Sequence, residues 1–597
     1  MLGGRFFSPR TVVLFSTICL AVSASGGDKL GPHLRQALLS LRPGGSIPVW
    51  VFFSDKGRHE WSGGAIPQSL VSPRSLARRR KVRPPGELVD DTDLPVEQSY
   101  VDSLLLTGAQ VRQRSRWFNA VSIAASEEII PRMEALACVR RLELVWRSRR
   151  EPDIAVAGEA AIPAHLPRRT VSSSLPDLNY GLSLPQVETI NIPAVHNTGN
   201  FGQGVIVGSF DNGFRLLEHE VFDSLRPRIM ATYDFVDHKV SVVPNDPNSP
   251  FGYHGIATLS TLAGYRPGEL IGPAFGASFI LARTENDSSE TPIEEDNWVA
   301  AMEWADSIGV DVTSTSLGYL TYDSPHPSWT WEDMNGNTTL ITRAADMAVA
   351  KGIVVVNSAG NNGFNGQHNT LNAPADGDSV ITVGAVSPDG VRAGFSSVGP
   401  TTSVPPRIKP DVMATGTTIL CASATDPHGY DYQQGTSFSC PLTAGVVAMI
   451  LHAHPDATPL QVRDELRSTA SQSTSPDNTM GWGVIDAYAA VFGSNPGEFR
   501  LDHNFPNPFP TPGNPSTTIP FTLSEPSHVS VIVFDVLGRE VSRLVNDDLP
   551  EGQGRAVWAG TNNSGKNVAS GVYFCRVMVS GASGRSFSDT QKISLIR

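Results

Sequence analysis

The feature that most constrains the fold is a set of four short, mostly apolar runs, rich in β-branched residues, within residues 178–493. They lie at residues 205–207, 278–281, 353–356 and 380–383. Helix-like segments separate them, for example at residues 298–307 and 340–351. Strands that are apolar throughout, rather than alternating with polar residues, are typical of a parallel sheet covered by helices on both faces. We therefore predict an α/β domain with a three-layer parallel-sheet core over residues 178–493.

The first residues indicate export. Arg5 and Arg10 precede an apolar run at residues 11–22, and the run ends in the small residues of VSA at 22–24. This is the pattern of a cleaved secretory signal peptide. The run is too short to cross a bilayer, and no later segment reaches about 18 apolar residues. We predict a signal peptide at residues 1–24 and a secreted or cell-surface protein without a transmembrane span.

Charge and cysteine content exclude two other classes. The net charge of −13 argues against a nucleic-acid partner, because duplex binding needs a basic surface. The one basic run, RRRK at 78–81, is interpreted as a solvated face or a protease-accessible loop and is given no binding role. The four cysteines beyond the signal have no paired spacing and predict neither a disulfide framework nor a zinc site. A bridge between Cys421 and Cys440 stays open beside the alternative of buried single thiols.

Two smaller units flank the α/β domain. Residues 28–151 combine a strand-like apolar run with a helical stretch, which predicts a small α+β unit. Residues 152–177 show little periodicity and are predicted to form an exposed connector open to cleavage. After a linker at 494–500, residues 501–597 carry short alternating strands between turn-rich segments, which predicts a β-sandwich.

Four polar elements of the α/β domain could carry chemistry. Asp211 follows the first apolar run, at the carboxyl end of a strand, where open α/β sheets place their sites. His254 lies beside a glycine at the start of a helix-like segment, and Asn361 lies in SAGNNG after the run at 353–356. Ser437, in GTSFSCP, precedes an apolar helix whose first N–H groups can stabilise a developing anion. Each element alone fits an ordinary turn or capped helix, but the four together in this order are hard to assemble by chance.

With these residues in this order, the chain resembles the subtilisin-like serine peptidases, the subtilase family, whose chain order is Asp, His, Ser. SAGNNG and GTSFSCP match most closely. Similar motifs are SLG at 316–318, KPDV at 409–412 and GWG at 481–483. The resemblance implies a subtilisin-like fold and a serine endopeptidase that hydrolyses proteins or peptides.

The resemblance also implies a role for each residue. Ser437 would attack the scissile carbonyl, His254 would take and return its proton, and Asp211 would orient the imidazole. Asn361 and the backbone N–H of Ser437 would form the oxyanion hole. The backbone segments implied to pair with an extended substrate are Ser316, Leu317 and Gly318, and Ser358, Ala359 and Gly360. No cofactor is required for this chemistry and no metal ligands are assigned; loop oxygens could hold a structural calcium ion, but no EF-hand spacing is present.

Three positions depart from the family pattern, and two residues compete for catalytic roles. The departures are Asn212, where Ser or Thr is usual, GIA at 255–257 and FSC at 438–440; none removes a member of the triad. His219 is the rival base, but it lies only eight positions after Asp211 and lacks a neighbouring glycine. Cys440, the rival nucleophile, is interpreted as a small buried helix residue.

The flanking units extend the resemblance. WFNAV at 117–121 is similar to the docking strand of inhibitor-like subtilase prodomains, which implies that residues 28–151 assist folding, inhibit the enzyme and are cut off between Arg149 and Asp177. NFPNPF at 504–509 and FDVLGREV at 534–541 are similar to a type A sorting domain of the type IX secretion route, related to immunoglobulin-like FlgD domains. The tail is therefore expected to contact the sorting machinery.

Alternatives to these functions remain open. The main one is a non-catalytic surface protein that binds peptides or adheres through a subtilase scaffold, but the presence of all four polar residues favours the enzyme. A narrower one is a processing enzyme dedicated to a single substrate. For the tail, the competitor is a carbohydrate-binding or adhesive sandwich, because this fold alone does not fix a function.

Overall fold

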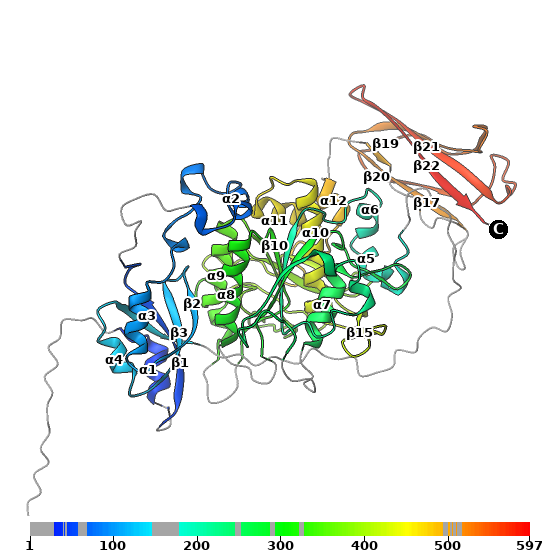
Figure 1. Ribbon diagram of the computed structural model, residues 1–597. Coiled ribbons are helices and arrows are strands. Elements are labelled where there is room, and N and C mark those ends of the chain that lie inside the picture. Colours follow the sequence, from blue (N-terminus) through cyan, green and yellow to red (C-terminus); the bar gives the residue numbers. More distant parts are fainter. Residues whose placement is uncertain are drawn as a thin grey trace, which may run out of the picture. The chain divides into compact units, whose positions relative to one another are not determined.

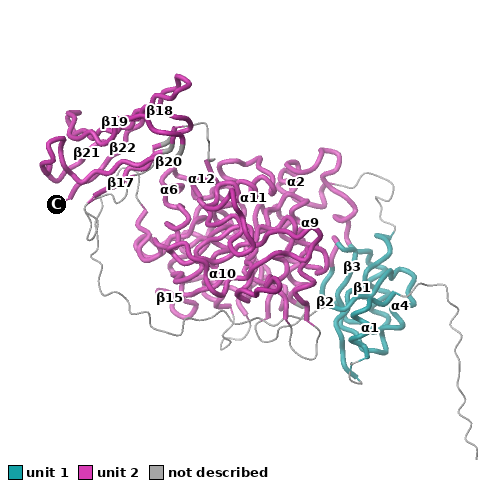
Figure 2. The backbone as a smooth tube through the Cα atoms, turned by 180° about the vertical axis from the view of Figure 1, so that it is seen from behind, with its two compact units in different colours: residues 1–59, 96–114, 118–145 teal, residues 60–95, 115–117, 146–597 magenta. Residues whose placement is uncertain are grey.

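The computed structural model of the chain describes residues 29–39, 41, 44–57, 68–145, 178–244, 252–286, 293–321, 328–492, 499–501, 504, 509 and 516–596 (Figure 1). The predicted signal peptide and connector lie outside these residues, as does most of the linker. The chain divides into two compact units, shown in Figure 2. Unit 1 comprises Met1–His59, Val96–Arg114 and Phe118–Val145, and unit 2 comprises Glu60–Pro95, Ser115–Trp117 and Trp146–Arg597. The sequence that we predicted as a prodomain is thus shared between the two units.

Unit 1 contains the larger part of the predicted α+β unit. Its elements are α1 (Pro32–Leu39), β1 (Ser46–Phe53), α3 (Gln98–Leu105), β2 (Gln110–Ser115), β3 (Ala120–Ser126), α4 (Ile130–Glu134) and β4 (Val139–Leu144). The strands form one sheet in the order β2-β3-β1-β4, and β1 pairs antiparallel with both β3 and β4. Because β1 is buried along almost its whole length, its apolar run forms the centre of this small core.

The core of unit 2 is a seven-stranded sheet in the order β13-β12-β11-β10-β5-β9-β6, and every neighbouring pair is parallel. The strands are β5 (Ile206–Asp211), β6 (Ile229–Asp234), β9 (Ser278–Arg283), β10 (Val312–Thr315), β11 (Val354–Ser358), β12 (Ile381–Val386) and β13 (Val412–Thr415). Four of them contain the apolar runs of the sequence. The predicted parallel sheet is confirmed.

Helices cover both faces of this sheet. They include α7 (Tyr253–Ala263), α8 (Ile293–Ile308), α9 (Leu340–Ala350), α10 (Thr436–Ala453), α11 (Pro459–Ser468) and α12 (Ala487–Phe492). In Figure 1, α8 and α9 lie on one side of the strands, and α7 and α10 lie on the other. Smaller elements are α2 (Pro73–Arg79), α5 (Leu184–Glu188), α6 (Ile192–His196), β7 (Tyr265–Arg266), β8 (Leu270–Ile271), β14 (Ile419–Ala422) and β15 (Tyr430–Gln433).

Helix α10 is the one helix, among the residues described, that is long and apolar enough to cross a membrane. Of its residues, 89% are buried inside the domain, so it is the central helix of the core. Its sequence does not form a continuous apolar run, because Pro441 and several hydroxyl residues interrupt the apolar residues of α10.

The C-terminal part is the predicted β-sandwich. Its strands are β16 (Arg500–Leu501), β17 (Thr517–Leu523), β18 (Ser527–Phe534), β19 (Glu540–Leu549), β20 (Gly552–Trp558), β21 (Gly571–Gly581) and β22 (Ser586–Leu595). They form two sheets, β16-β17-β20 and β19-β18-β21-β22. Phe521 and Trp558 of one sheet and Val531 and Val577 of the other share one buried core.

The basic run at residues 78–81 corrects a prediction. Arg78 and Arg79 are only 2% and 0% exposed, whereas Arg80 between them and Lys81 is exposed. Both buried guanidinium groups pair with Asp306 of α8, and Arg79 also pairs with Asp93. The run is therefore not a solvated face, because Asp306, which is distant in the sequence, and Asp93, 14 residues from Arg79, neutralise its first two residues.

Candidate active site

Asp211 and His254 form a hydrogen-bonded pair where β5 ends and α7 begins. His254 Nδ1 lies 2.6 Å from Asp211 Oδ1, and the two residues are 8% and 1% exposed. The backbone N–H of Asn212 also donates to Oδ1, at 2.8 Å, and the hydroxyl of Thr258 donates to Oδ2, at 2.8 Å. These contacts fix the carboxylate, so it holds the imidazole in one orientation.

The contact of Thr258 with Asp211 was not predicted from the sequence, although the spacing of Thr258 from His254 indicates it. Thr258 lies four residues after His254, and residues with this spacing share one face of a helix. A hydroxyl at that position can reach the same carboxylate as the histidine. The contact makes α7 the source of two side chains that hold Asp211.

The turn after Asp211 gives Asn212 and Gly255 local structural roles. The amide oxygen of Asn212 accepts the backbone N–H of Gly255 at 3.1 Å, which is the local role expected of this side chain. A Cβ atom on Gly255 would lie 2.1 Å from the carbonyl oxygen of Gly213. Helix α7 therefore approaches the turn after β5 too closely for any residue but glycine beside His254.

Ser437 lies in the first turn of α10 and is 4% exposed. Its hydroxyl donates to the carbonyl oxygen of Ser316 at 3.4 Å, and the hydroxyl of Ser316 donates to the carbonyl oxygen of Ser437 at 2.7 Å. The ring of Phe438, the next residue, has its centroid 6.1 Å from that of His254. The structure therefore brings Ser437, Ser316 and the Asp211–His254 pair into one region.

Asn361 is tied to the residue that precedes Ser437. Its Oδ1 accepts from both the backbone N–H and the hydroxyl of Thr436, each at 3.0 Å. The backbone N–H of Gly360 donates to the same hydroxyl at 3.3 Å. Gly360 has φ +109°, a conformation that side chains disfavour. Hydrogen bonds therefore join SAGNNG to GTSFSCP, and Asn361 contacts Thr436, the residue next to Ser437.

The two predicted substrate segments follow neighbouring parallel strands. Residues 316–318 come directly after β10, and residues 358–360 lie at the end of β11. The side-chain amide of Asn357 donates to the carbonyl oxygen of Leu317 at 3.1 Å and so links the two segments. A Cβ atom on Gly318 would lie 2.8 Å from Cβ of Asn372, which explains the glycine at that position.

Three models of known protein families match parts of this chain. The model of the subtilase family matches residues 202–483, that of the peptidase S8 propeptide domain of Bacteroidota matches 48–157, and that of the FlgD Ig-like domain matches 510–583. The chain is 31% identical over 390 residues to subtilisin NAT of Bacillus subtilis subsp. natto, covering 64% of this chain and 84% of that protein. The chain belongs to the subtilase family. It is a serine endopeptidase with a propeptide domain.

Two further relatives cover the same region of this subtilase. Subtilisin of Bacillus pumilus is 34% identical over 317 residues, covering 52% of this chain and 98% of that protein. Serine protease AprX of Bacillus subtilis is 30% identical over 321 residues, covering 49% and 67%. The predictions of fold class and of enzyme class are therefore confirmed.

The rival base and rival nucleophile both have structural contacts in this subtilase. His219 is buried; its Nε2 lies 2.8 Å from the carbonyl oxygen of Gly429, and its Nδ1 accepts from the backbone N–H of Val221 at 3.1 Å. Cys440 is fully buried, and burial raises the pKa of its thiol to about 12. A thiol with so high a pKa is a poor nucleophile.

The alternative disulfide is wrong. Cys421 and Cys440 are both free thiols, and Cys421 Sγ instead lies 3.3 Å from the carbonyl oxygen of Asp431. The region the structure describes contains no group of three or more His, Cys, Asp and Glu side chains placed to hold a metal ion.

Proposed function

We propose that this subtilase is exported as a zymogen and hydrolyses peptide bonds through Asp211, His254 and Ser437. The observation that carries this proposal is the 2.6 Å contact between His254 Nδ1 and Asp211, because it leaves Nε2 as the nitrogen that can take a proton. A serine hydroxyl is a weak nucleophile at its ordinary pKa and needs such a base. Asp211 then stabilises the imidazolium that forms and is not itself protonated.

Asn361 and the backbone N–H of Ser437 supply the oxyanion hole in this proposal. Thr436 engages the Oδ1 atom of Asn361, so Nδ2 is the end of the amide that can donate to a substrate oxygen. The first N–H groups of α10 add a favourable dipole where negative charge develops. The backbone of residues 316–318 and 358–360 pairs with an extended peptide, which favours unfolded or loop segments of proteins as substrates. The chemistry requires no cofactor.

The propeptide acts as the enzyme's own inhibitor until it is cut off between Arg149 and Asp177. A contact within unit 2 supports docking of the WFNAV region. Glu303 of α8 accepts the backbone N–H groups of Arg116 and Trp117 at 3.0 and 3.2 Å. Burial raises the pKa of Glu303, and this carboxylate is satisfied by residues of the propeptide.

The β-sandwich directs the protein to the cell surface through the sorting machinery of type IX secretion. The match to the FlgD Ig-like domain supports the fold of this tail, and the sequence motifs suggest its role. Deletion of residues 501–597 is expected to abolish surface attachment, measured by fractionating cells and medium. Unchanged surface attachment of the deletion variant would contradict this role.

The activity is tested by fluorophosphonate labelling of the secreted protein, with peptide mapping of the modified residue and N-terminal sequencing of the same band. Labelling of Ser437 on a chain that lacks residues 1 to about 150 is expected. Ser437→Ala should abolish labelling. Ser439→Ala is the matched control, since its hydroxyl only donates to backbone carbonyls of β13, and it should still be labelled. A folded, processed chain that is not labelled would favour the non-catalytic peptide-binding alternative.

A further inference from the structure

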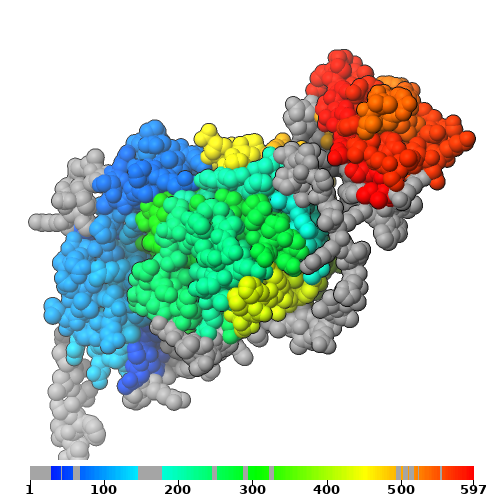
Figure 3. All heavy atoms as spheres, turned by 45° about the vertical axis from the view of Figure 1, so that its right-hand side comes forward, coloured from blue at the N-terminus to red at the C-terminus, as the bar shows by residue number. Residues whose placement is uncertain are grey.

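Residues 68–95 lie within the sequence predicted as the prodomain, yet they belong to unit 2. They form α2 and three short turns of 3-10 helix, η1 (Gln68–Leu70), η2 (Pro85–Glu87) and η3 (Asp91–Asp93). In the space-filling view, blue atoms from this part of the chain lie directly against the green atoms of the catalytic domain (Figure 3). The polar contacts of α2 reveal how they are attached.

The segment caps the C-terminal end of α8. The last carbonyl groups of a helix have no partner within it and need donors from elsewhere. The backbone N–H of Ser72 donates to the carbonyl oxygen of Ser307 at 3.1 Å, and its hydroxyl donates to that of Ile308 at 2.7 Å. Gly309 directly follows helix α8 with φ +101°, and a Cβ atom there would lie 2.8 Å from the backbone nitrogen of Ser75. Glycine therefore allows α2 to approach this helix end.

The same arrangement recurs at the end of α9. Arg78 donates through Nε to the carbonyl oxygen of Lys351 at 3.1 Å and through Nη1 to that of Val310 at 2.7 Å. Helix α9 is followed by Gly352, with φ +91°, and a Cβ atom there would lie 3.0 Å from the carbonyl oxygen of Arg78. A cation at a helix C-terminus also complements the helix dipole. Two helix ends are thus shaped for one segment.

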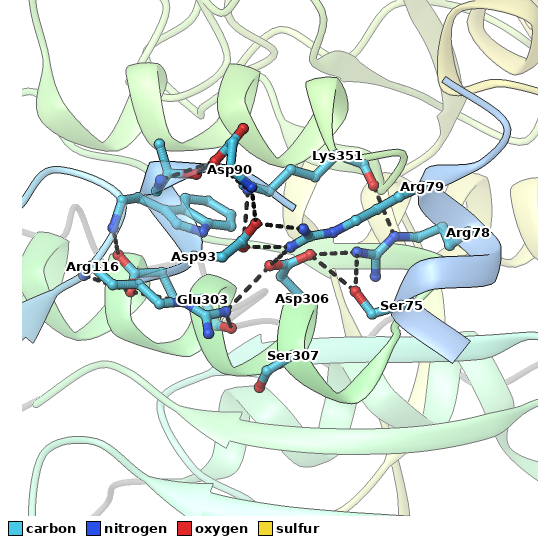
Figure 4. A network of polar contacts seen from close by, with 12 residues as sticks. Ser75, Arg78, Arg79, Asp90, Asp93, Arg116, Glu303, Asp306, Ser307 and Lys351 are labelled. Atoms are coloured by element: carbon cyan, nitrogen blue, oxygen red, sulfur yellow. Dashed lines mark hydrogen bonds and ion pairs between the residues drawn. The ribbon is translucent and has the colours of Figure 1, made fainter. Parts of the chain in front are cut away.

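A buried charge network joins these ends, as Figure 4 shows. Asp306 of α8 is 0% exposed; it accepts from Arg78 and, at 2.6 Å, from Arg79. Arg79 makes a two-pronged pair with Asp93, at 2.7 and 2.8 Å, and Lys351 donates to Asp93 at 3.2 Å. Buried ions need such partners, because an unpaired charge away from water is costly.

The charges come from both sides of the interface. Asp306 and Lys351 belong to the catalytic domain, and their partners Arg78, Arg79 and Asp93 belong to the segment. Burial acts to raise the pKa of Asp93, but hydrogen bonds from Arg79 and the charge of Lys351 outweigh it and lower that pKa below its usual range. The network therefore recognises a short helix with two consecutive arginines and a following carboxylate.

We propose that the C-terminal ends of α8 and α9 form a docking surface for residues 72–93, and that this segment stays there as a separate, non-covalently bound part of the mature enzyme. The inference rests on the proposed cleavage of the connector, and it requires two further cuts, one before residue 72 and one after residue 93, that separate the segment from unit 1. It has a structural consequence for the active site. Helix α8 leads into β10 and α9 leads into β11, whose other ends carry Ser316 and Ser358. The retained segment supports the strands that deliver the substrate-binding backbone.

The test uses the full chain with Ser437→Ala, a C-terminal affinity tag and a recognition sequence for an added site-specific protease inserted in the connector. The added protease cuts the connector whether or not the enzyme processes itself. Whether the enzyme is a self-processing zymogen is tested separately, with the unaltered chain. After cutting, the protein is treated briefly with trypsin, captured on the tag and analysed by mass spectrometry. We expect residues 72–93 to be retained while peptides of unit 1 are lost, because cleavage at 78–81 requires the docked helix to open.

Arg79→Met tests whether the network holds the segment, and Arg80→Met is the matched control that removes one exposed charge and one tryptic site next to it. Retention should fall at least about 10-fold with Arg79→Met, which removes the two-pronged pair with Asp93 and one of the partners of Asp306, and stay unchanged with Arg80→Met. Loss of the segment from the protein with native arginines would overturn the proposal without reference to any variant. Equal retention in both arginine variants would overturn the role of the network.

Discussion

The catalytic domain contains two buried polar clusters at opposite edges of its sheet, one at the edge where the parallel strands end and one at the edge where they begin. The Asp211–His254 pair and Ser437 lie where β5 and β10 end, whereas the Arg79–Asp306 cluster lies where α8 and α9 end, next to the starts of β10 and β11. At the first edge, every polar group comes from a short motif that follows a strand or starts a helix. At the second edge, cations and carboxylates come from segments that are 227 residues apart. The comparison separates groups that we propose to be catalytic from groups that we propose to hold two parts of the chain together.

The largest expected effect is at the first edge. His254→Ala removes the proposed base and should lower kcat by about 10⁶-fold while the fold stays intact. Steady-state hydrolysis of a peptide substrate measures the loss, and thermal unfolding verifies the fold. His219→Ala is the comparison variant, because the contacts of His219 are with backbone groups. It should lower the free energy of unfolding, but the kcat of the folded variant should stay within a few-fold of the wild-type value. A kcat that falls equally in both variants would contradict the assignment of His254.

The second edge should respond in stability instead. Asp306→Asn leaves Arg78 and Arg79 without their shared carboxylate, which is expected to lower the free energy of unfolding by about 3–5 kcal/mol. Urea unfolding of the uncut Ser437→Ala chain measures this change. Glu87→Gln, an exposed carboxylate in the same docked segment, is the control and should change the value by no more than about 0.5 kcal/mol. Equal effects of the two substitutions would contradict a special role of the buried pair.

The two clusters also differ in how far they could be predicted from the sequence. The sheet was predictable because its strands are apolar throughout. Roles for Asp211, His254, Asn361 and Ser437 could be proposed because each residue lies in a local motif, and these roles stay predictions. The docking of Arg78 and Arg79 could not be predicted. A basic run is interpreted as solvent-exposed unless the carboxylates that pair with it are known. Asp93 and Asp306 carry no local signal that assigns them to these arginines.

A smaller effect is expected at the oxyanion hole. Asn361→Leu removes the proposed side-chain donor and should lower kcat by about 10²- to 10³-fold with little change in KM, because the donor acts on the transition state. Single-turnover and steady-state kinetics on one peptide substrate measure the two constants. Asn361→Asp keeps Oδ1 for Thr436 but removes the Nδ2 donor, so it should lose activity without loosening this contact. A variant that raises KM and spares kcat would assign Asn361 to substrate binding alone.

The smallest expected effect concerns Thr258, which separates support of the triad from chemistry. Thr258→Val keeps the shape of the side chain but removes the 2.8 Å hydrogen bond to Asp211 Oδ2, a bond to a charged group. Such a bond contributes about 1.5 kcal/mol or more, so kcat/KM should fall about 10-fold, far less than with His254→Ala. Thr261→Val is the control, since Thr261 lies on the same helix and its hydroxyl donates only to the carbonyl oxygen of Ala257. An equal fall in kcat/KM with Thr261→Val would mean that Thr258 supports the packing of α7 and not the position of Asp211.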